Sequence, residues 1–189
     1  MPHDLLADLR ASTRPQHDAL EALGPSRRLT DGTLDADGYE GVIAWQRDAH
    51  AVAEGGLQEY PWPGAYAYRS RGDALAREGV APARRRVRPL RAPESLAAAV
   101  GRAYVFEGSA LGGNVILGHL RANPRLAAYA PFPFYAFQRE VGLGQWRAFV
   151  AFATGRAWSS DEVAVAATAA REAFAAFAPA GRAGEPPAP

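Results

Sequence analysis

The chain has 189 residues, and its 21 basic and 20 acidic side chains give a net charge of +1, which argues against nucleic acid as a partner. It contains no cysteine and no lysine, which excludes thiolate nucleophiles, disulfides, iron–sulfur clusters, Schiff bases and the lysine of a phosphate-binding loop. No apolar run reaches the roughly 18 residues of a membrane span, and the N-terminus lacks a secretory signal pattern, so we expect one cytoplasmic domain without a membrane segment.

Helices separated by proline and glycine are predicted in the first half of the chain. They span about residues 4–23, 33–55 and 68–78. Gly24-Pro25 is a helix stop signal after the first, and Thr33 or Asp35 is the expected N-cap of the second. A basic connector follows at residues 84–91, and a solvated loop is the favoured interpretation of its arginines.

The second half of the chain also reads as helical. A long helix is predicted over residues 93–121, and shorter ones are predicted at 134–142, 144–154 and 160–177. No clean strand pattern is present, so the sequence predicts an all-α domain of about seven to nine helices over residues 1–180. Residues 181–189 are rich in glycine, proline and alanine, and we expect them to form a disordered tail.

Glycines interrupt the long helix at an unusual density. Residues 108–113 have the sequence Gly-Ser-Ala-Leu-Gly-Gly, and each glycine in a helix interior costs roughly 1 kcal/mol relative to alanine. Helices keep such residues where a ligand or another backbone must come close. Two explanations stay open at this point: a flat ligand that lies on the helix, and close packing of another helix over small residues.

A histidine–acid pair lies in the first predicted helix. His17 and Glu21 are four residues apart, so their side chains share one face. A neutral imidazole ligates iron through one nitrogen, while a carboxylate orients the ring through the other. Arg10 and Arg14 lie near the same face, where guanidinium groups would meet the acidic arms of a planar ligand. The alternative is an exposed histidine on a solvated, charged face.

The other histidines carry weaker signals. His50 and Glu54 repeat the four-residue spacing, but the sequence lacks the Glu-x-x-His motifs of a di-iron bundle, so we expect His50 to be structural or on the surface. His119 is expected near the C-terminal end of the long helix, where its charge would interact with the helix dipole. His3 lies in a terminus that we expect to fray.

Two helix motifs together resemble the haem oxygenase family, most closely its bacterial, phytochrome-associated branch. Residues 9–21, Leu-Arg-Ala-Ser-Thr-Arg-Pro-Gln-His-Asp-Ala-Leu-Glu, resemble the proximal helix of that family. Residues 104–116, Tyr-Val-Phe-Glu-Gly-Ser-Ala-Leu-Gly-Gly-Asn-Val-Ile, resemble its distal helix, and residues 144–149 are similar to a later helix. The resemblance covers about residues 5–155 and implies a haem-oxygenase-like bundle with haem b sandwiched between the proximal and distal helices.

The resemblance assigns roles on the proximal side. His17 would be the proximal ligand of the haem iron, and Glu21 the carboxylate that orients it. Arg10, Arg14 and Arg147 match positions where the family places basic residues around the haem propionates.

On the distal side, Gly108, Gly112 and Gly113 match the glycines that let backbone lie against the haem. Ser109 stands where the animal branch has an aspartate that organises the distal water, and the bacterial branch often lacks that aspartate as well. Asn114 or a backbone carbonyl is left as a group that would order this water.

The activity implied by the resemblance is oxidative cleavage of haem to biliverdin, carbon monoxide and ferrous iron. Haem would be both substrate and oxygen activator, with electrons from an external donor such as ferredoxin or ascorbate and a phytochrome as a downstream partner. A haem-binding or haem-sensing protein without turnover stays open because of Ser109. A thiaminase-type enzyme usually needs a cysteine nucleophile, which is missing here, and a helical interaction module is the remaining alternative.

Overall fold

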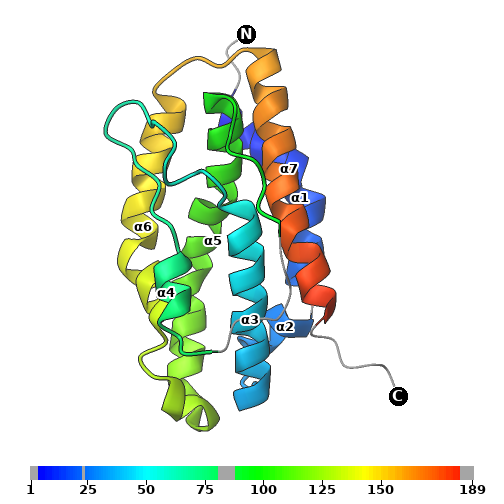
Figure 1. Ribbon diagram of the computed structural model, residues 1–189, viewed down its shortest axis with the longest axis vertical. Helices are drawn as coiled ribbons and strands as arrows, with labels where there is room; N and C mark the ends of the chain where they lie inside the picture. Colours follow the sequence, from blue (N-terminus) through cyan, green and yellow to red (C-terminus); the bar gives the residue numbers. More distant parts are fainter. Residues whose placement is uncertain (1–3, 23, 81–87, 184–189) are drawn as a thin grey trace.

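The computed structural model of the chain describes residues 4–22, 24–80 and 88–183. This part forms a bundle of seven α-helices and one 3-10 helix without a strand (Figure 1). In chain order the elements are α1 (Leu5–Glu21), α2 (Gly24–Arg28), α3 (Ala36–Ala53), α4 (Gly72–Ala76), α5 (Leu96–Ala122), η1 (Pro124–Tyr129), α6 (Pro133–Thr154) and α7 (Ser160–Ala183). The predicted all-α class and the number of helices are confirmed.

Side-chain caps explain where the long helices begin. Asp4, Asp35 and Ser95 each accept a hydrogen bond from the backbone N–H three residues further on, at 3.2, 2.9 and 3.2 Å. Asp35, one of the two candidates from the sequence, is therefore the N-cap of α3. At the start of α7, Ser159 and Glu162 form a reciprocal capping box, in which each backbone N–H donates to the other side chain.

Two predicted helices differ from those observed. The prediction of two helices at residues 134–142 and 144–154 was wrong, because both ranges belong to the continuous helix α6. Gly142 does not end the helix: a Cβ placed there would lie 3.0 Å from the carbonyl oxygen of Ala110 in α5, so glycine allows close packing of the two helices. The short helix expected over residues 68–78 is observed only as α4, and backbone without regular secondary structure precedes it.

The bundle is organised around α5, which packs against α6 on one side and α7 on the other. The contact with α7 is close at Gly101, where a Cβ would overlap the backbone of Ala166. Helix α1 packs mainly on α7 and touches α6 (Figure 1). Helices α1, α5 and α7 run in the same direction, whereas α3 and α6 run the opposite way (Figure 1).

Some expectations concern the ends and a connector of the chain. Helix α7 extends to Ala183, six residues beyond the predicted helix end, so its backbone includes the first three residues of the expected tail. Residues 184–189, His3 and the connector residues 84–87 lie outside the described part of the chain. None of the described helices combines the length and apolar character that crossing a membrane requires.

Candidate functional site

The imidazole of His17 lies on the outside of α1, with 56% of its side chain exposed. Its Nε2 is 3.7 Å from Oε1 of Glu21, and its Nδ1 is 3.7 Å from Oδ1 of Asp18. On the neighbouring helix α7, the ring of Phe174 is edge-on to the imidazole at 6.4 Å between centroids. His17 is therefore accessible to a ligand, and a carboxylate faces each of its ring nitrogens.

Helix α1 comes near α5 one turn before His17. Burial raises the pKa of Tyr104 in α5, and the neighbouring side chains of Thr13 and Arg10 in α1 partly offset this rise. Thr13 is buried, and its Oγ1 donates to the carbonyl oxygen of Leu9 at 2.8 Å. Helices α1 and α5 run in the same direction (Figure 1), and His17 and Gly108 come one turn after Thr13 and Tyr104 along their respective helices.

The face of α5 at this level is apolar and open. Leu111, Gly112 and Val115 follow Gly108 at intervals that keep them on one side of the helix. Leu111 is 42% exposed and Val115 is 59% exposed, and a Cβ at Gly112 would meet no atom within 4 Å. Leu143 of α6 is 54% exposed. Leu111 and Val115 are two of the four large apolar side chains that are exposed in the described residues, which marks this face of α5 as a place for an apolar partner.

The glycines of α5 do not all serve this open face. A Cβ at Gly108 would lie 3.9 Å from the ring of Trp146, which is ordinary contact. Gly113 is buried, and a Cβ there would overlap the side chain of Gln138 in α6. Close helix packing, one of the two explanations left open by the sequence, therefore accounts for Gly113, whereas Gly112 faces free space.

Ser109 is exposed, but its hydroxyl is turned back to its own helix. Its Oγ donates to the carbonyl oxygen of Phe106 at 2.9 Å. The hydroxyl hydrogen is therefore used within α5, and only the oxygen lone pairs remain to accept a hydrogen bond.

The three arginines that were singled out in the sequence, Arg10, Arg14 and Arg147, are all exposed. Arg10 acts electrostatically on Tyr104, whose ring lies 6.2 Å from that of Trp146, the residue before Arg147. Arg10 of α1 and Trp146 of α6 thus both lie near Tyr104 of α5. The Nε of Arg14 lies 3.6 Å from Oδ2 of Asp18, and because both side chains are exposed this pair contributes little to stability.

A buried polar cluster lies behind α5, and the sequence analysis did not predict it. Glu107 is fully buried, and its two carboxylate oxygens accept hydrogen bonds from the Tyr66 hydroxyl at 2.7 Å and from Nη2 of Arg71 at 2.9 Å. The backbone N–H of Arg71 donates to Oε1 of Glu54 at 3.1 Å. Glu107 is the one acidic residue of α5 and comes directly before the glycine run, which was the signal in the sequence.

His50 belongs to the same cluster and is structural. It is 3% exposed, its Nδ1 is 2.8 Å from Oε1 of Glu54, and its ring packs against Phe106 and Phe134 at 5.1 and 5.5 Å between centroids. Glu54 also accepts hydrogen bonds from Tyr68 and Ser70. Burial disfavours the charge of Glu54, but hydrogen bonds from His50, Ser70 and Tyr68 outweigh it and lower its pKa to about 2.

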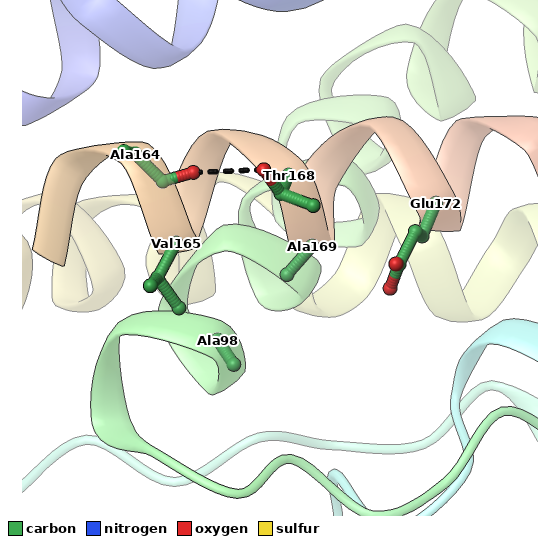
Figure 2. A pocket seen from close by; sticks show the side chains of 6 residues that line it. All are labelled: Ala98, Ala164, Val165, Thr168, Ala169 and Glu172. Carbon is green, nitrogen blue, oxygen red and sulfur yellow. Dashed lines mark hydrogen bonds between the residues drawn. The ribbon is translucent and has the colours of Figure 1, made fainter. Parts of the chain in front are cut away.

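A separate shallow hollow of about 380 Å³ lies between the first turn of α5 and α7 (Figure 2). Its lining consists of Ala98, Ala164, Val165, Thr168, Ala169 and Glu172. The hydroxyl of Thr168 already donates to the carbonyl oxygen of Ala164 at 2.9 Å, which leaves Glu172 as the one charged group (Figure 2). This lining does not assemble groups for catalysis.

At the level of sequence, no family model and no curated protein matches the chain. Solved structures do match. The haem oxygenase from Neisseria meningitidis, studied in its NO- and CO-bound forms, is similar with a TM-score of 0.66 and 23% identity over 95% of this chain and 91% of that one. The chain has a haem-oxygenase-like fold.

A second haem-oxygenase structure shares this fold. Haem oxygenase-1 from the cyanobacterium Synechocystis, in complex with haem, is similar with a TM-score of 0.65 and 14% identity over 96% of this chain and 92% of that one. The resemblance to bacterial haem oxygenases is therefore confirmed at the level of the haem-oxygenase-like fold.

Proposed function

We propose that haem binds in a groove between α1 and α5, with His17 on one side and Gly112 on the other. We propose further that the chain cleaves the haem to biliverdin, carbon monoxide and ferrous iron. The observation that carries the proposal is the exposed imidazole of His17 on α1, a helix that comes near α5 with its open space at Gly112. Haem is a flat, apolar ring with iron at its centre, so the iron would suit the imidazole of His17 and the ring would suit the open face of α5. The proposed haem-binding domain spans residues 1–180, and helix α7 continues past this range to Ala183.

On the proximal side, His17 would hold the iron through one ring nitrogen. The other nitrogen would donate its proton to Glu21 or Asp18, which already lie 3.7 Å away. Such a carboxylate fixes the tautomer and orientation of a ligating imidazole. Glu21 is the orienting residue in this proposal because it lies on the same face of α1 as His17.

On the distal side, the open space at Gly112 would admit the haem, and Leu111, Val115 and Leu143 would cover its apolar surface. Gly108 would allow the backbone of α5 to approach, while Gly113 supports the site indirectly by seating α5 on α6. Arg10, Arg14 and Arg147 would pair with the propionates. The proposed haem site uses no lysine or cysteine, and the sequence contains neither residue.

Bound haem would supply the iron that activates dioxygen, and an external donor such as ferredoxin or ascorbate would supply the electrons. The role of the protein is to hold the haem plane, limit access of bulk water and order a distal proton donor. The Ser109 hydroxyl donates to Phe106, so we assign it the role of a hydrogen-bond acceptor for distal water. Asn114, which is exposed on α5, is the second candidate for ordering this water.

A haem-binding protein without turnover is the second candidate function. The observation that favours it is again Ser109, which offers no acidic proton and whose hydrogen is already used. Under the first proposal, the product would be a bilin suited to a phytochrome of the bacterial type. Under the second, the haem complex would persist.

Titration with hemin, followed by absorption spectroscopy, tests the binding step. We expect His17→Ala to remove the axial-ligand spectrum without unfolding the protein, because the side chain is exposed. His119→Ala is the matched control, since His119 is an exposed histidine further along the same face of α5. Loss of the spectrum in the control and not in His17→Ala would transfer the ligand role to His119.

Addition of ascorbate and dioxygen to the hemin complex tests the reaction. We expect the haem absorption to be replaced by that of biliverdin, with release of carbon monoxide. Haem that survives prolonged incubation and returns to the ferric form would instead establish the non-degrading function.

A further inference from the structure

An ion pair between Arg71 and Glu107 lies inside the bundle, directly behind the open face of α5. The two side chains are 1% and 0% exposed, and Nη2 of Arg71 is 2.9 Å from Oε2 of Glu107. Removing two charges from water costs much of what their attraction returns, so a buried pair is weak evidence for a role in stability. Its position, one residue before Gly108, suggests a role in shaping the site.

The pair fixes two successive residues of α5. Arg71 donates through Nη2 to the Glu107 carboxylate and also, at 3.3 Å, to the carbonyl oxygen of Phe106. The same carbonyl accepts the Ser109 hydroxyl at 2.9 Å, and the second oxygen of Glu107 accepts the Tyr66 hydroxyl at 2.7 Å. The turn of α5 that leads into the glycine run is therefore held from behind by donors from one loop.

That loop is itself anchored to two other helices. The backbone N–H of Arg71 donates to Oε1 of Glu54 at the end of α3, at 3.1 Å. The side chain of Gln145 in α6 donates to the carbonyl oxygen of Ala67 at 2.6 Å. The loop is thus fixed to the end of α3 and to α6, and its Arg71 guanidinium bonds to α5, which gives the glycine run a defined position relative to the rest of the bundle.

We propose that Arg71 is a positioning residue that, through Glu107 and the Phe106 carbonyl, sets where the open face of α5 stands relative to His17. Arg71 and Glu107 would not touch the haem. The effect on haem seating rests on the proposed function. The hydrogen bonds by which Arg71 holds α5 do not depend on that function.

The test compares two variants that disturb buried carboxylates. Arg71→Met combined with Glu107→Gln removes both charges of the pair, retains the approximate side-chain sizes and leaves neither partner of the pair as an isolated buried charge. Glu78→Gln is the control, since Glu78 is a buried acid that accepts hydrogen bonds from Tyr39 and from the backbone of Phe134, away from α5.

Amide hydrogen exchange of the haem-free protein gives the first readout. We expect the double variant to speed exchange at residues 106–113 by about tenfold relative to the amides of α7, because local opening exchanges only the released segment. Glu78→Gln should not produce this local change. Acceleration that is uniform along the chain, or equal in the two variants, would overturn the inference, because it would show a general loss of stability.

The hemin complex gives the second readout, measured well below the unfolding temperature. We expect the double variant to retain the His17 axial spectrum but to change the ratio of biliverdin isomers, with a larger effect on kcat than on KM. Unchanged isomers together with unchanged kcat would overturn the inference. If the unaltered chain binds no hemin, the proposed function fails, whereas the exchange result still decides whether Arg71 positions α5.

Discussion

At the scale of single residues, Glu54 shows how the fold keeps a buried acid ionised. Burial disfavours the charge, but donors from three side chains, His50, Ser70 and Tyr68, together lower the pKa of Glu54 to about 2. Glu54 also holds the backbone of Arg71. The ionised state of one carboxylate therefore supports the whole polar cluster behind α5.

This arrangement predicts a specific loss of stability in acid. The folded pKa lies below the model-compound value of 4.5, so Glu54 stabilises the fold at neutral pH, and this contribution is lost as the pH falls from about 4.5 toward 2. Between pH 5 and pH 3, we expect the free energy of unfolding to fall by about 2 kcal/mol more in the original chain than in Glu54→Gln. Urea unfolding at both pH values measures this difference. Equal losses in the two proteins would contradict the assignment.

At the scale of an element, α5 uses its glycines on two faces. Gly112 faces open space, whereas Gly113 packs against Gln138. We expect Gly112→Leu to leave the fold intact, because it replaces glycine with a better helix former, and to weaken hemin binding at least about tenfold by filling the groove. We expect Gly113→Ala to lower the free energy of unfolding by about 1–3 kcal/mol through overlap with α6.

Thermal unfolding and hemin titration of both variants separate the two roles. Hemin binding that Gly112→Leu leaves unchanged would mean that this face does not meet the ligand. Full stability of Gly113→Ala would show that Gln138 moves aside at little cost.

Local sequence patterns were sufficient to predict most of the helices. The errors in helix boundaries arose where contacts between distant segments determine whether a helix continues. The proline and glycine punctuation predicted α1, α3 and α5, and the N-cap of α3 was narrowed to Thr33 or Asp35, because these signals lie within a few residues. Gly142 was misread as a helix break, since its reason is the approach of Ala110 from another helix. The helix expected at residues 68–78 is shorter because Tyr68 and Arg71 bond to α3 and α5.

In the candidate site, too, features set by local geometry were predicted and features set by distant contacts were not. The spacing of His17 and Glu21 placed both on one face of a helix, which local geometry alone decides. The exposure of Leu143 beside α5, and the burial of Gly113 against α6, depend on how helices cross and could not be read from the sequence. Glu107 carried a local signal, but its partners Tyr66 and Arg71 lie 41 and 36 residues away in the chain.

At the scale of the whole molecule, α1 and α5, the two helices that would form the walls of the proposed groove, share little direct packing. Helix α1 packs chiefly on α7 and touches α6, and α7 in turn packs on α5, so the walls are connected through neighbours and the Thr13–Tyr104 contact. A ligand bound to His17 on one wall and to the face of α5 on the other would link them directly. Binding should therefore stabilise the entire bundle and not only the groove.

The size of this stabilisation follows from the linkage between ligand binding and folding. A ligand that binds only the folded state adds about 2.7 kcal/mol to the free energy of unfolding at a concentration of 100 times its dissociation constant. We expect hemin to produce an increase of this order in the original chain, and a much smaller one in His17→Ala, because that variant keeps the apolar wall and loses the iron ligand. Chemical unfolding with and without hemin measures the free energy of unfolding. A hemin solution without protein serves as the blank. An equal increase in both proteins would mean that hemin binds without His17, and stabilisation of neither would mean that the groove does not hold it.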